Sequence, residues 1–319
     1  MGKFDPRPAE DFNFDEILYT KKDWVATITI NREKVYNALN GQCILEMVQA
    51  LQDASWDDGV AVVVMTGAGE KAFCTGGDVK EYTTDLLSKP REYYKWFYAF
   101  NQVHDLLRNL GKPSIARLNG MVVGGGNEIN LSCDLAIAAE HAKIRQVGTS
   151  VGSVAAAGAT QLLPIIVGDR RARQILWLNE WVDAKTALAW GLVNEVVPMA
   201  ELDKAVATMC EKLIDKFPEC TRYTRQQTNF WRDLGWNLTV GHARDWLTLH
   251  YASIEPYEGM TSFVEKRPTQ YRMVRERARD GKSSEFLWGH YKHLCPQCGA
   301  KGLPADFAFC GVCGVKLGG

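Results

Sequence analysis

Two glycine-rich turns, each preceded by an apolar run, constrain the fold of this sequence more than any other feature. The first turn (residues 73–78, FCTGGD) follows the apolar run 60–66, and the second (121–128, MVVGGGNE) follows the run 114–118. An apolar run that leads into glycines predicts a strand and a tight turn, in which backbone N–H groups can approach a ligand without a Cβ atom in the way. Either turn alone could be an ordinary connection from a strand to a helix. Two such turns that face each other can direct two N–H donors at one oxygen atom, which is an oxyanion hole.

Strands and helices are expected to alternate along the first half of the chain. The expected elements are a hairpin over 16–32, helices over 44–51, 91–110 and 128–133, and strands over 60–66, 114–118 and 134–139. The hairpin rests on alternating apolar and polar residues, and the helices rest on apolar residues that recur every three or four positions. Short crossovers between strands and helices favour an α/β fold with parallel strands. From about residue 202 the apolar spacing is helical.

Composition narrows the class of protein. The chain has 319 residues, of which 46% are hydrophobic, so it can form one large domain and a smaller appendage. A formal net charge of -1 gives no reason to expect a nucleic acid or a membrane as partner, and no apolar run approaches the roughly 18 residues of a membrane-spanning helix. The N-terminal residues lack the apolar core of a signal peptide, and nine cysteines suit a reducing compartment better than a disulfide framework. We therefore expect a cytoplasmic protein.

The two turns belong to longer motifs. Residues 72–81 (AFCTGGDVKE) follow the pattern A-F-x-x-G-x-D-x-x-E, and residues 120–128 (GMVVGGGNE) follow G-x-x-x-G-G-G-x-E. They resemble the signature regions of the crotonase (enoyl-CoA hydratase/isomerase) superfamily, and the resemblance extends from about residue 17 to about residue 277. It implies an acyl-CoA substrate whose thioester oxygen accepts hydrogen bonds from the backbone of Gly77 and Gly125. It also implies that Glu128 transfers the proton, although a carboxylate at this position could simply be favoured by the helix dipole.

The same resemblance implies the architecture and the contacts with coenzyme A. The expected parts are an α/β, crotonase-like ββα spiral core over 1–200, a helical oligomerisation region over 201–284 and a homo-oligomer that is a trimer or a dimer of trimers. The residues expected to bind substrate or coenzyme A are Lys34, Tyr36, Thr75, Gly76, Asp78 and Ser153, together with Lys266 and Arg267 from a neighbouring subunit. Each of the basic residues could instead be an ordinary surface charge.

A missing carboxylate bears on the reaction. Hydratases of the family carry a second glutamate about twenty residues after the first, and Gly148 stands at that place here. The pattern Q-x-G-x-x-x-G-S over 146–153 resembles the branch that contains 1,4-dihydroxy-2-naphthoyl-CoA synthase and 6-oxocyclohex-1-ene-1-carbonyl-CoA hydrolase. The synthases usually carry an aspartate shortly afterwards, whereas residues 154–157 read VAAA. We therefore expect hydration or hydrolytic ring opening of a cyclic enoyl- or oxoacyl-CoA. The alternatives are a double-bond isomerase, an ordinary enoyl-CoA hydratase and a non-catalytic acyl-CoA-binding scaffold.

Four cysteines near the C-terminus form a separate motif. Cys295 and Cys298 are followed, after eleven intervening residues, by Cys310 and Cys313, and a glycine comes directly after each pair. This spacing is typical of a four-thiolate zinc site. The sequence therefore predicts a zinc ribbon over 285–319 with one structural zinc ion, and two disulfides are the alternative. A ribbon of this size buries too little apolar surface to fold without its metal.

Overall fold

The computed structural model describes residues 6–317, and its larger sheet forms the centre of the molecule. Six strands lie in the order β1 (Ile17–Lys22), β2 (Val25–Ile30), β3 (Val62–Gly67), β5 (Ser114–Leu118), β7 (Leu135–Ala139) and β10 (Glu195–Val197). The first two form the expected antiparallel hairpin, and every other neighbouring pair is parallel.

The continuous apolar run of β3 is explained by burial on both faces of this sheet. Val63 and Met65 belong to the main core, which α1 (Gly41–Trp56) and α3 (Pro90–Arg108) help to form. Val62 and Val64 belong to a second core, which α8 (Leu202–Ile214) covers with Val206. Successive side chains of a strand point to opposite faces, so a parallel sheet with both faces covered needs apolar residues at every position.

A second sheet holds the two glycine turns. Its strands lie in the order β4 (Ala72–Cys74), β6 (Met121–Val123), β8 (Lys143–Arg145) and β9 (Val182–Asp183). The first three are parallel and β9 is antiparallel to β8. Each of β3, β5 and β7 is followed by a strand of this small sheet, and the chain then turns into a helical segment. This repeated order confirms the predicted spiral of ββα units. Because the carboxyl ends of parallel strands meet at one edge, the turns after β4, β6 and β8 lie side by side.

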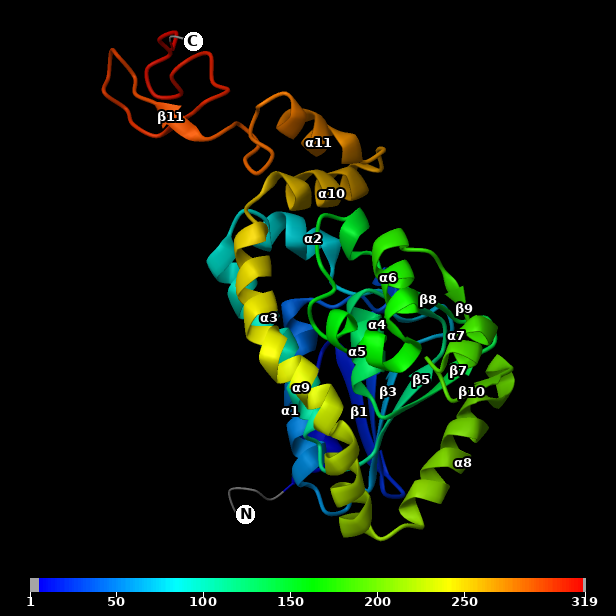
Figure 1. Cartoon of the computed structure of the whole chain (residues 1–319). Coiled ribbons are helices and arrows are strands. Elements are labelled where there is room, and N and C mark those ends of the chain that lie inside the picture. Colours follow the sequence, from blue (N-terminus) through cyan, green and yellow to red (C-terminus); the bar gives the residue numbers. More distant parts are fainter. Residues whose placement is uncertain (1–5, 318–319) are drawn as a thin grey trace.

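Helices surround both sheets (Figure 1). The remaining ones are α2 (Val79–Glu81), α4 (Gly125–Ser132), α5 (Ala159–Val167), α6 (Asp169–Leu178), α7 (Ala184–Trp190), α9 (Pro218–His250), α10 (Ile254–Glu265) and α11 (Tyr271–Arg279). Short helical turns lie at Ala9–Asp11, Glu33–Val35, Tyr82–Leu86, Gly148–Ser150 and Met199–Glu201. The 33-residue α9 packs along α3 and extends along much of the molecule. No helix within residues 6–317 combines the length and the apolarity that crossing a membrane requires.

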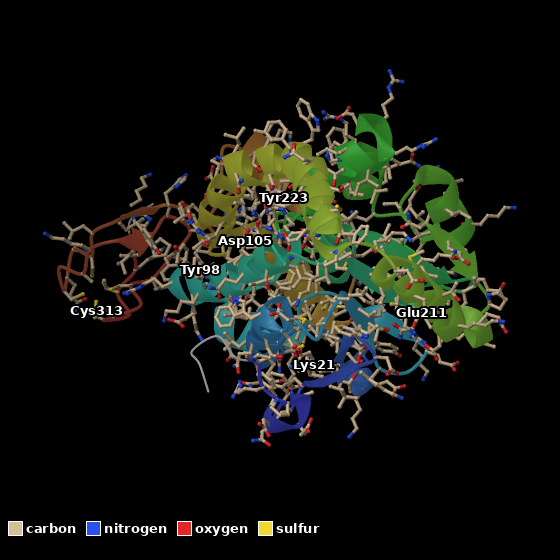
Figure 2. The ribbon with its side chains drawn as sticks, turned by 90° about the horizontal axis from the view of Figure 1, so that it is seen from below. Lys21, Tyr98, Asp105, Glu211, Tyr223 and Cys313 are labelled. Atoms are coloured by element: carbon tan, nitrogen blue, oxygen red, sulfur yellow. The ribbon has the colours of Figure 1, made fainter. Side chains whose placement is uncertain are left out.

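The C-terminal ribbon projects beyond α10 and α11 at one end of the molecule (Figure 1), and contains β11 (Tyr291–His293) and β12 (Leu303–Pro304). Figure 2 places Cys313 of the ribbon at the opposite end of the molecule from Glu211 of α8. The ribbon is anchored to the helices beside it. The N–H of Ile254 donates to the carbonyl of Glu285 at 2.9 Å, and the Arg277 guanidinium lies 2.9 Å from the Asp306 carboxylate.

Candidate active site

A cavity of about 890 Å³ opens at the edge of the small sheet where the three turns meet. Most of the residues that the sequence singled out line it, although they come from distant parts of the chain. They are Lys34, Tyr36, Thr75, Gly76, Gly77, Asp78, Gly125, Glu128, Ser153 and Lys266. Gly148 lies in the same wall. The two sheets of the spiral therefore bring the predicted groups together, with Arg267 as the exception.

The two glycine turns touch each other inside this cavity. A Cβ atom on Gly76 would lie 3.0 Å from the backbone nitrogen of Gly125, and the positive φ of Gly76 (84°) is one that a side chain disfavours. The backbone of Leu39 fixes the first turn, because it donates to the Gly76 carbonyl and accepts from the Asp78 N–H, both at 2.8 Å. Gly125 is the first residue of α4, so its N–H has no partner within the helix. Across residues 6–317, neither the Gly77 nor the Gly125 N–H donates to a protein group. Both donors are free for a ligand.

Glu128 lies in the first turn of α4 with its side chain buried. Its Oε1 accepts hydrogen bonds from the N–H groups of Ala157 (2.8 Å) and Ala159 (3.4 Å). Burial raises the pKa of Glu128 to about 8, because desolvation of the carboxylate outweighs these two bonds, which favour the ionised form. Its Oε2 accepts no hydrogen bond from the described part of the chain. A carboxyl group with a pKa near neutrality and one free oxygen is suited to proton transfer.

No second carboxylate is available beside Glu128 among the described lining residues. The only other one is Asp78, and its Oδ2 accepts from the Arg32 guanidinium at 3.1 Å. The backbone also leaves little space for an acid at Gly148, where a Cβ atom would lie 3.0 Å from the Ser153 carbonyl oxygen and 3.2 Å from the Ala155 nitrogen. The site therefore contains one carboxyl group that is free to react.

An aromatic wall encloses the inner part of the cavity and was not identified from the sequence. It comprises Tyr82, Tyr93, Trp96, Phe97 and Phe100. The rings of Tyr82 and Trp96 meet edge to face, with centroids 5.0 Å apart. Trp96 and Phe100 recur at helical spacing with Val103 and Leu107, which correctly predicted one buried face of α3 but did not show that part of this face borders a cavity. Tyr82 carries no comparable signal. The wall makes the inner cavity apolar and suited to a flat or cyclic group.

The outer wall of the cavity differs from the expectation in the chain that supplies Lys266. It comes from the same chain, because Met260, Phe263 and Val264 of α10 line the cavity together with Lys266. Lys266 was expected from a neighbouring subunit, but it ends α10 in a left-handed conformation (φ 53°) beside its own cavity.

The side chain of Arg267 is paired with carboxylates outside the cavity. Its two terminal nitrogens each lie 2.7 Å from the carboxylate of Glu258, and its Nε donates to Glu265. It does not belong to the cavity lining within the described residues. This bidentate pairing engages the guanidinium within its own chain, and a contact of Arg267 with the substrate of a neighbouring subunit stays a prediction.

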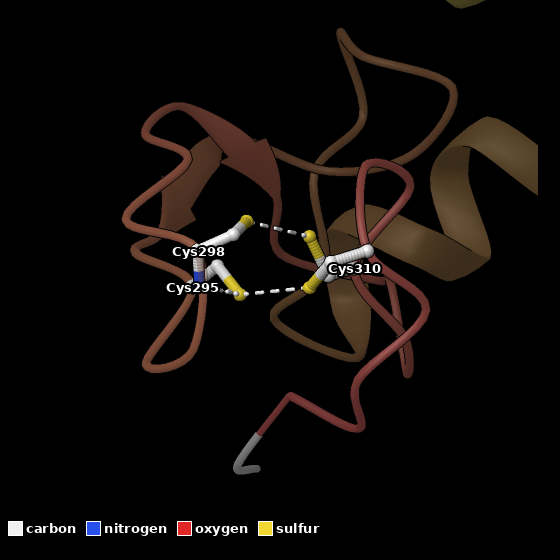
Figure 3. A group of neighbouring side chains, drawn as sticks. Cys295, Cys298 and Cys310 are labelled. Carbon is white, nitrogen blue, oxygen red and sulfur yellow. Dashed lines mark hydrogen bonds between the residues drawn. The ribbon is translucent and has the colours of Figure 1, made fainter.

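The four C-terminal cysteines converge as the sequence predicts (Figure 3). The sulfur atoms of Cys295 and Cys313 are 3.5 Å apart, those of Cys298 and Cys310 are 3.8 Å apart, and all four lie within 4.8 Å of one another. These separations are too long for disulfides. Around a tetrahedral zinc ion with bonds of about 2.3 Å, two sulfurs lie about 3.8 Å apart. The geometry therefore fits a metal ion with four thiolate ligands.

The local chain explains why the sulfurs converge. Each C-x-x-C pair closes through a backbone hydrogen bond, from Gly299 to Cys295 (3.0 Å) and from Gly314 to Cys310 (2.8 Å). Both glycines have a positive φ (72° and 76°), as such tight turns require. His293 lies outside the group and its Nε2 is 3.1 Å from the Ala305 carbonyl oxygen.

Known proteins share this sequence pattern and this fold. Residues 20–273 match the model of the enoyl-CoA hydratase/isomerase family. Among solved structures, an enoyl-CoA hydratase from Mycobacterium avium subsp. paratuberculosis K-10 is 27% identical, with 81% of this chain and 98% of that chain covered and a TM-score of 0.73. An enoyl-CoA hydratase from Bacillus anthracis is 29% identical, with 81% and 99% covered and a TM-score of 0.65. DspI from Pseudomonas aeruginosa is 28% identical, with 82% and 99% covered and a TM-score of 0.67.

Proposed function

The chain belongs to the enoyl-CoA hydratase/isomerase family, and on this premise we propose that it hydrates a cyclic enoyl- or oxoacyl-CoA, or opens its ring by hydrolysis. The observation that carries the proposal is the single free carboxyl group, Glu128, in a cavity that also presents two free N–H donors and an aromatic wall. An ordinary pair of carboxylates is not present among the described lining residues.

The first step concerns the thioester. Its carbonyl oxygen accepts hydrogen bonds from the N–H groups of Gly77 and Gly125, which lie on turns in mutual contact. Attack by water at the β-carbon moves an electron pair through the α-carbon onto this oxygen, and the two donors stabilise the enolate that forms. Loss of one such donor typically costs about 3 to 4 kcal/mol of transition-state stabilisation.

In the proposed reaction, Glu128 transfers the proton. Its free Oε2 removes a proton from the attacking water, and the carboxyl group then returns a proton to the α-carbon, so one carboxyl serves as base and as acid. A ring ketone beside the α-carbon permits a further step. A second water loses a proton to the Glu128 carboxylate and adds to the ketone carbon. The bond from this carbon to the α-carbon then breaks, its electron pair enters the same thioester enolate, and Glu128 returns the proton to the α-carbon. The former ketone carbon becomes a carboxylic acid at the far end of the opened chain.

One observation favours a second candidate, a double-bond isomerase. A single carboxyl group suffices to move a proton between two carbons of an enoyl chain, and Glu128 is the one free carboxyl in the described cavity lining.

Mass spectrometry of the products separates these functions. The protein is incubated with linear enoyl-CoA esters and with cyclic enoyl- and oxoacyl-CoA esters, and Glu128→Gln serves as the matched inactive variant. Addition of one water to a cyclic enoyl ester without a ring ketone supports hydration, and addition of one water to a saturated cyclic oxoacyl ester supports ring opening. Addition of two waters to an ester with both groups supports hydration followed by ring opening. A product of unchanged mass supports the isomerase. Absence of any product from every ester would contradict both.

Coenzyme A and a homo-oligomer complete the proposal. Lys34, Tyr36 and Lys266 lie exposed where the cavity opens, and we assign them to the coenzyme A part of the substrate.

Large apolar side chains on α9 are exposed in the single chain, among them Trp231 (69%) and Leu238 (78%). An apolar helix face of this kind favours burial between subunits. The proposed assembly is a trimer or a dimer of trimers.

The cysteine cluster is proposed to bind one structural zinc ion. Cys295, Cys298, Cys310 and Cys313 supply four thiolates and so leave no open position for water or substrate. Zinc at this site would contribute folding free energy to the ribbon, whose own core is small.

A further inference from the structure

Arg145 is a cavity residue that the proposed reaction does not yet use. It ends β8 and pairs in register with Val123 of β6, and its carbonyl accepts from the N–H of Gly124 at 3.0 Å. Neighbouring strands lie about 4.8 Å apart, so Arg145 lies one strand away from the second glycine turn. Arg145 lines the same cavity as Glu128. A residue with a permanent positive charge therefore borders the cavity one strand away from the second glycine turn.

The Arg145 side chain is held in place by two contacts. Its Nε donates to the carbonyl of Asn179 at 2.5 Å, and its guanidinium carbon lies 5.4 Å from the centre of the Trp181 ring. Trp181 also lines the cavity and directly precedes β9, which pairs with β8. A guanidinium fixed in this way loses little conformational entropy when it binds a ligand.

Arg145 has no acidic partner in residues 6–317, and its two terminal nitrogens make no hydrogen bond there. Two other half-buried arginines are paired with carboxylates: Arg32 with Glu16 and Asp78, and Arg267 with Glu258 and Glu265. The lysines that line the cavity are exposed, whereas Arg145 is half-buried. A half-buried, immobilised and unpaired guanidinium is suited to an anionic ligand, because it offers two parallel N–H donors to an oxyanion.

We propose that Arg145, held against Trp181, binds a carboxylate at the far end of the acyl group. The inference rests on the proposed function, because ring opening creates a carboxylate at that position. The substrate class is then an acyl-CoA whose chain carries a terminal carboxylate or acquires one during the reaction. A phosphate of coenzyme A offers the same oxyanion chemistry, but a long pantetheine arm separates it from the thioester, whereas Arg145 lies beside the turn that binds the thioester.

Binding of unreactive product analogues tests this assignment without turnover. Pimeloyl-CoA, which ends in a carboxylate, is compared by calorimetry with heptanoyl-CoA, which has the same chain length and no carboxylate. Both acyl groups are also tested as pantetheine thioesters, which lack the phosphates. The wild-type protein should prefer each pimeloyl ester by roughly 10- to 100-fold, the range of a charge-assisted hydrogen bond. Arg145→Gln should remove this preference and leave heptanoyl-CoA binding unchanged, and Arg145→Lys should retain part of it.

Arg173→Gln is the matched control, because Arg173 is exposed on α6, paired with Asp169 and absent from the cavity lining. Equal weakening of both coenzyme A esters by Arg145→Gln, with the pantetheine esters unaffected, would overturn the assignment in favour of a phosphate contact. A wild-type protein without preference for the pimeloyl esters would also overturn it. A melting temperature close to that of wild type shows that Arg145→Gln is folded. The proposed function fails separately, if cyclic esters are not converted although the carboxylate preference is present.

Discussion

Replacement of Glu128 by glutamine tests both the chemistry and the electrostatics of the site. Glutamine keeps the size of the side chain and an oxygen that can accept from the N–H of Ala157, but its amide neither accepts nor releases a proton near neutral pH. We expect turnover to fall by about 100-fold or more, as general acid–base catalysis implies. Binding of the acyl-CoA should change little, since the oxyanion donors belong to the backbone.

The same substitution has a calculable effect on stability. The pKa of Glu128 is about 8 in the folded protein, against an ordinary value of 4.5. Between these two pH values the unfolded chain is ionised while the folded protein retains its proton, so unfolding releases a proton and becomes more favourable as pH rises. At about 1.4 kcal/mol per pH unit, the free energy of unfolding falls by about 5 kcal/mol across this window. Below pH 4.5 the burial of Glu128 carries no such penalty, and above pH 8 the penalty is complete.

Melting temperatures of wild type and Glu128→Gln, measured from pH 5 to pH 9, give the test. The melting temperature of Glu128→Gln minus that of wild type should increase as pH rises and should level off above about pH 8. Glu258→Gln is the control. The hydrogen bond from Arg267 lowers the pKa of Glu258, so its contribution is lost only as pH falls through that lowered value, and the difference from wild type should stay constant from pH 5 to pH 9. A Glu128→Gln difference that does not vary with pH would refute the raised pKa.

Four further outcomes follow from the geometry. The kcat/KM of the wild type should rise with pH up to about 8, because the ionised Glu128 accepts the first proton; a profile that falls over this range would reverse its role. Gly148→Glu should not create an efficient hydratase of crotonyl-CoA, since the backbone of Ser153 lies 3.0 Å from the added Cβ atom, and efficient turnover would contradict this. Gly126→Ala should lower the melting temperature by several degrees, because its Cβ atom would lie 2.2 Å from the backbone oxygen of Cys74; an unchanged melting curve would count against this packing. Elemental analysis should find about one zinc per wild-type chain and none in Cys310→Ser, and zinc retained by the variant would exclude the four-thiolate site.

The central part of the site could be predicted from sequence because it is built from backbone requirements. Glycines that must approach a ligand leave a local pattern, and Glu128 lies two residues after the last glycine of the second turn. The four cysteines are predictable for a similar reason, since metal ligands need fixed spacing. Such features depend on a few consecutive residues and hardly on the rest of the fold.

The features that the sequence did not reveal depend on contacts between distant segments. Helical spacing predicted that Trp96 and Phe100 are buried, but not that the same face borders a cavity. The sequence likewise could not show that Lys266 completes the cavity of its own chain, because the path of α10 is decided by packing. Arg145 has no local signal, since only the pairing of β8 with β9 brings Trp181 beside it.

Both donors of the proposed oxyanion hole are main-chain N–H groups, which has a consequence for how such a chain can diverge. A point mutation elsewhere in the cavity changes a side chain and leaves the peptide groups of Gly77 and Gly125 where they are. Side chains in residues 146–155 or on the aromatic face of α3 can therefore be exchanged step by step while the chain keeps the two N–H donors that are proposed to polarise a thioester. In laboratory evolution, libraries restricted to these two segments should retain this shared activity in most members, while libraries that vary the glycine turns should lose it.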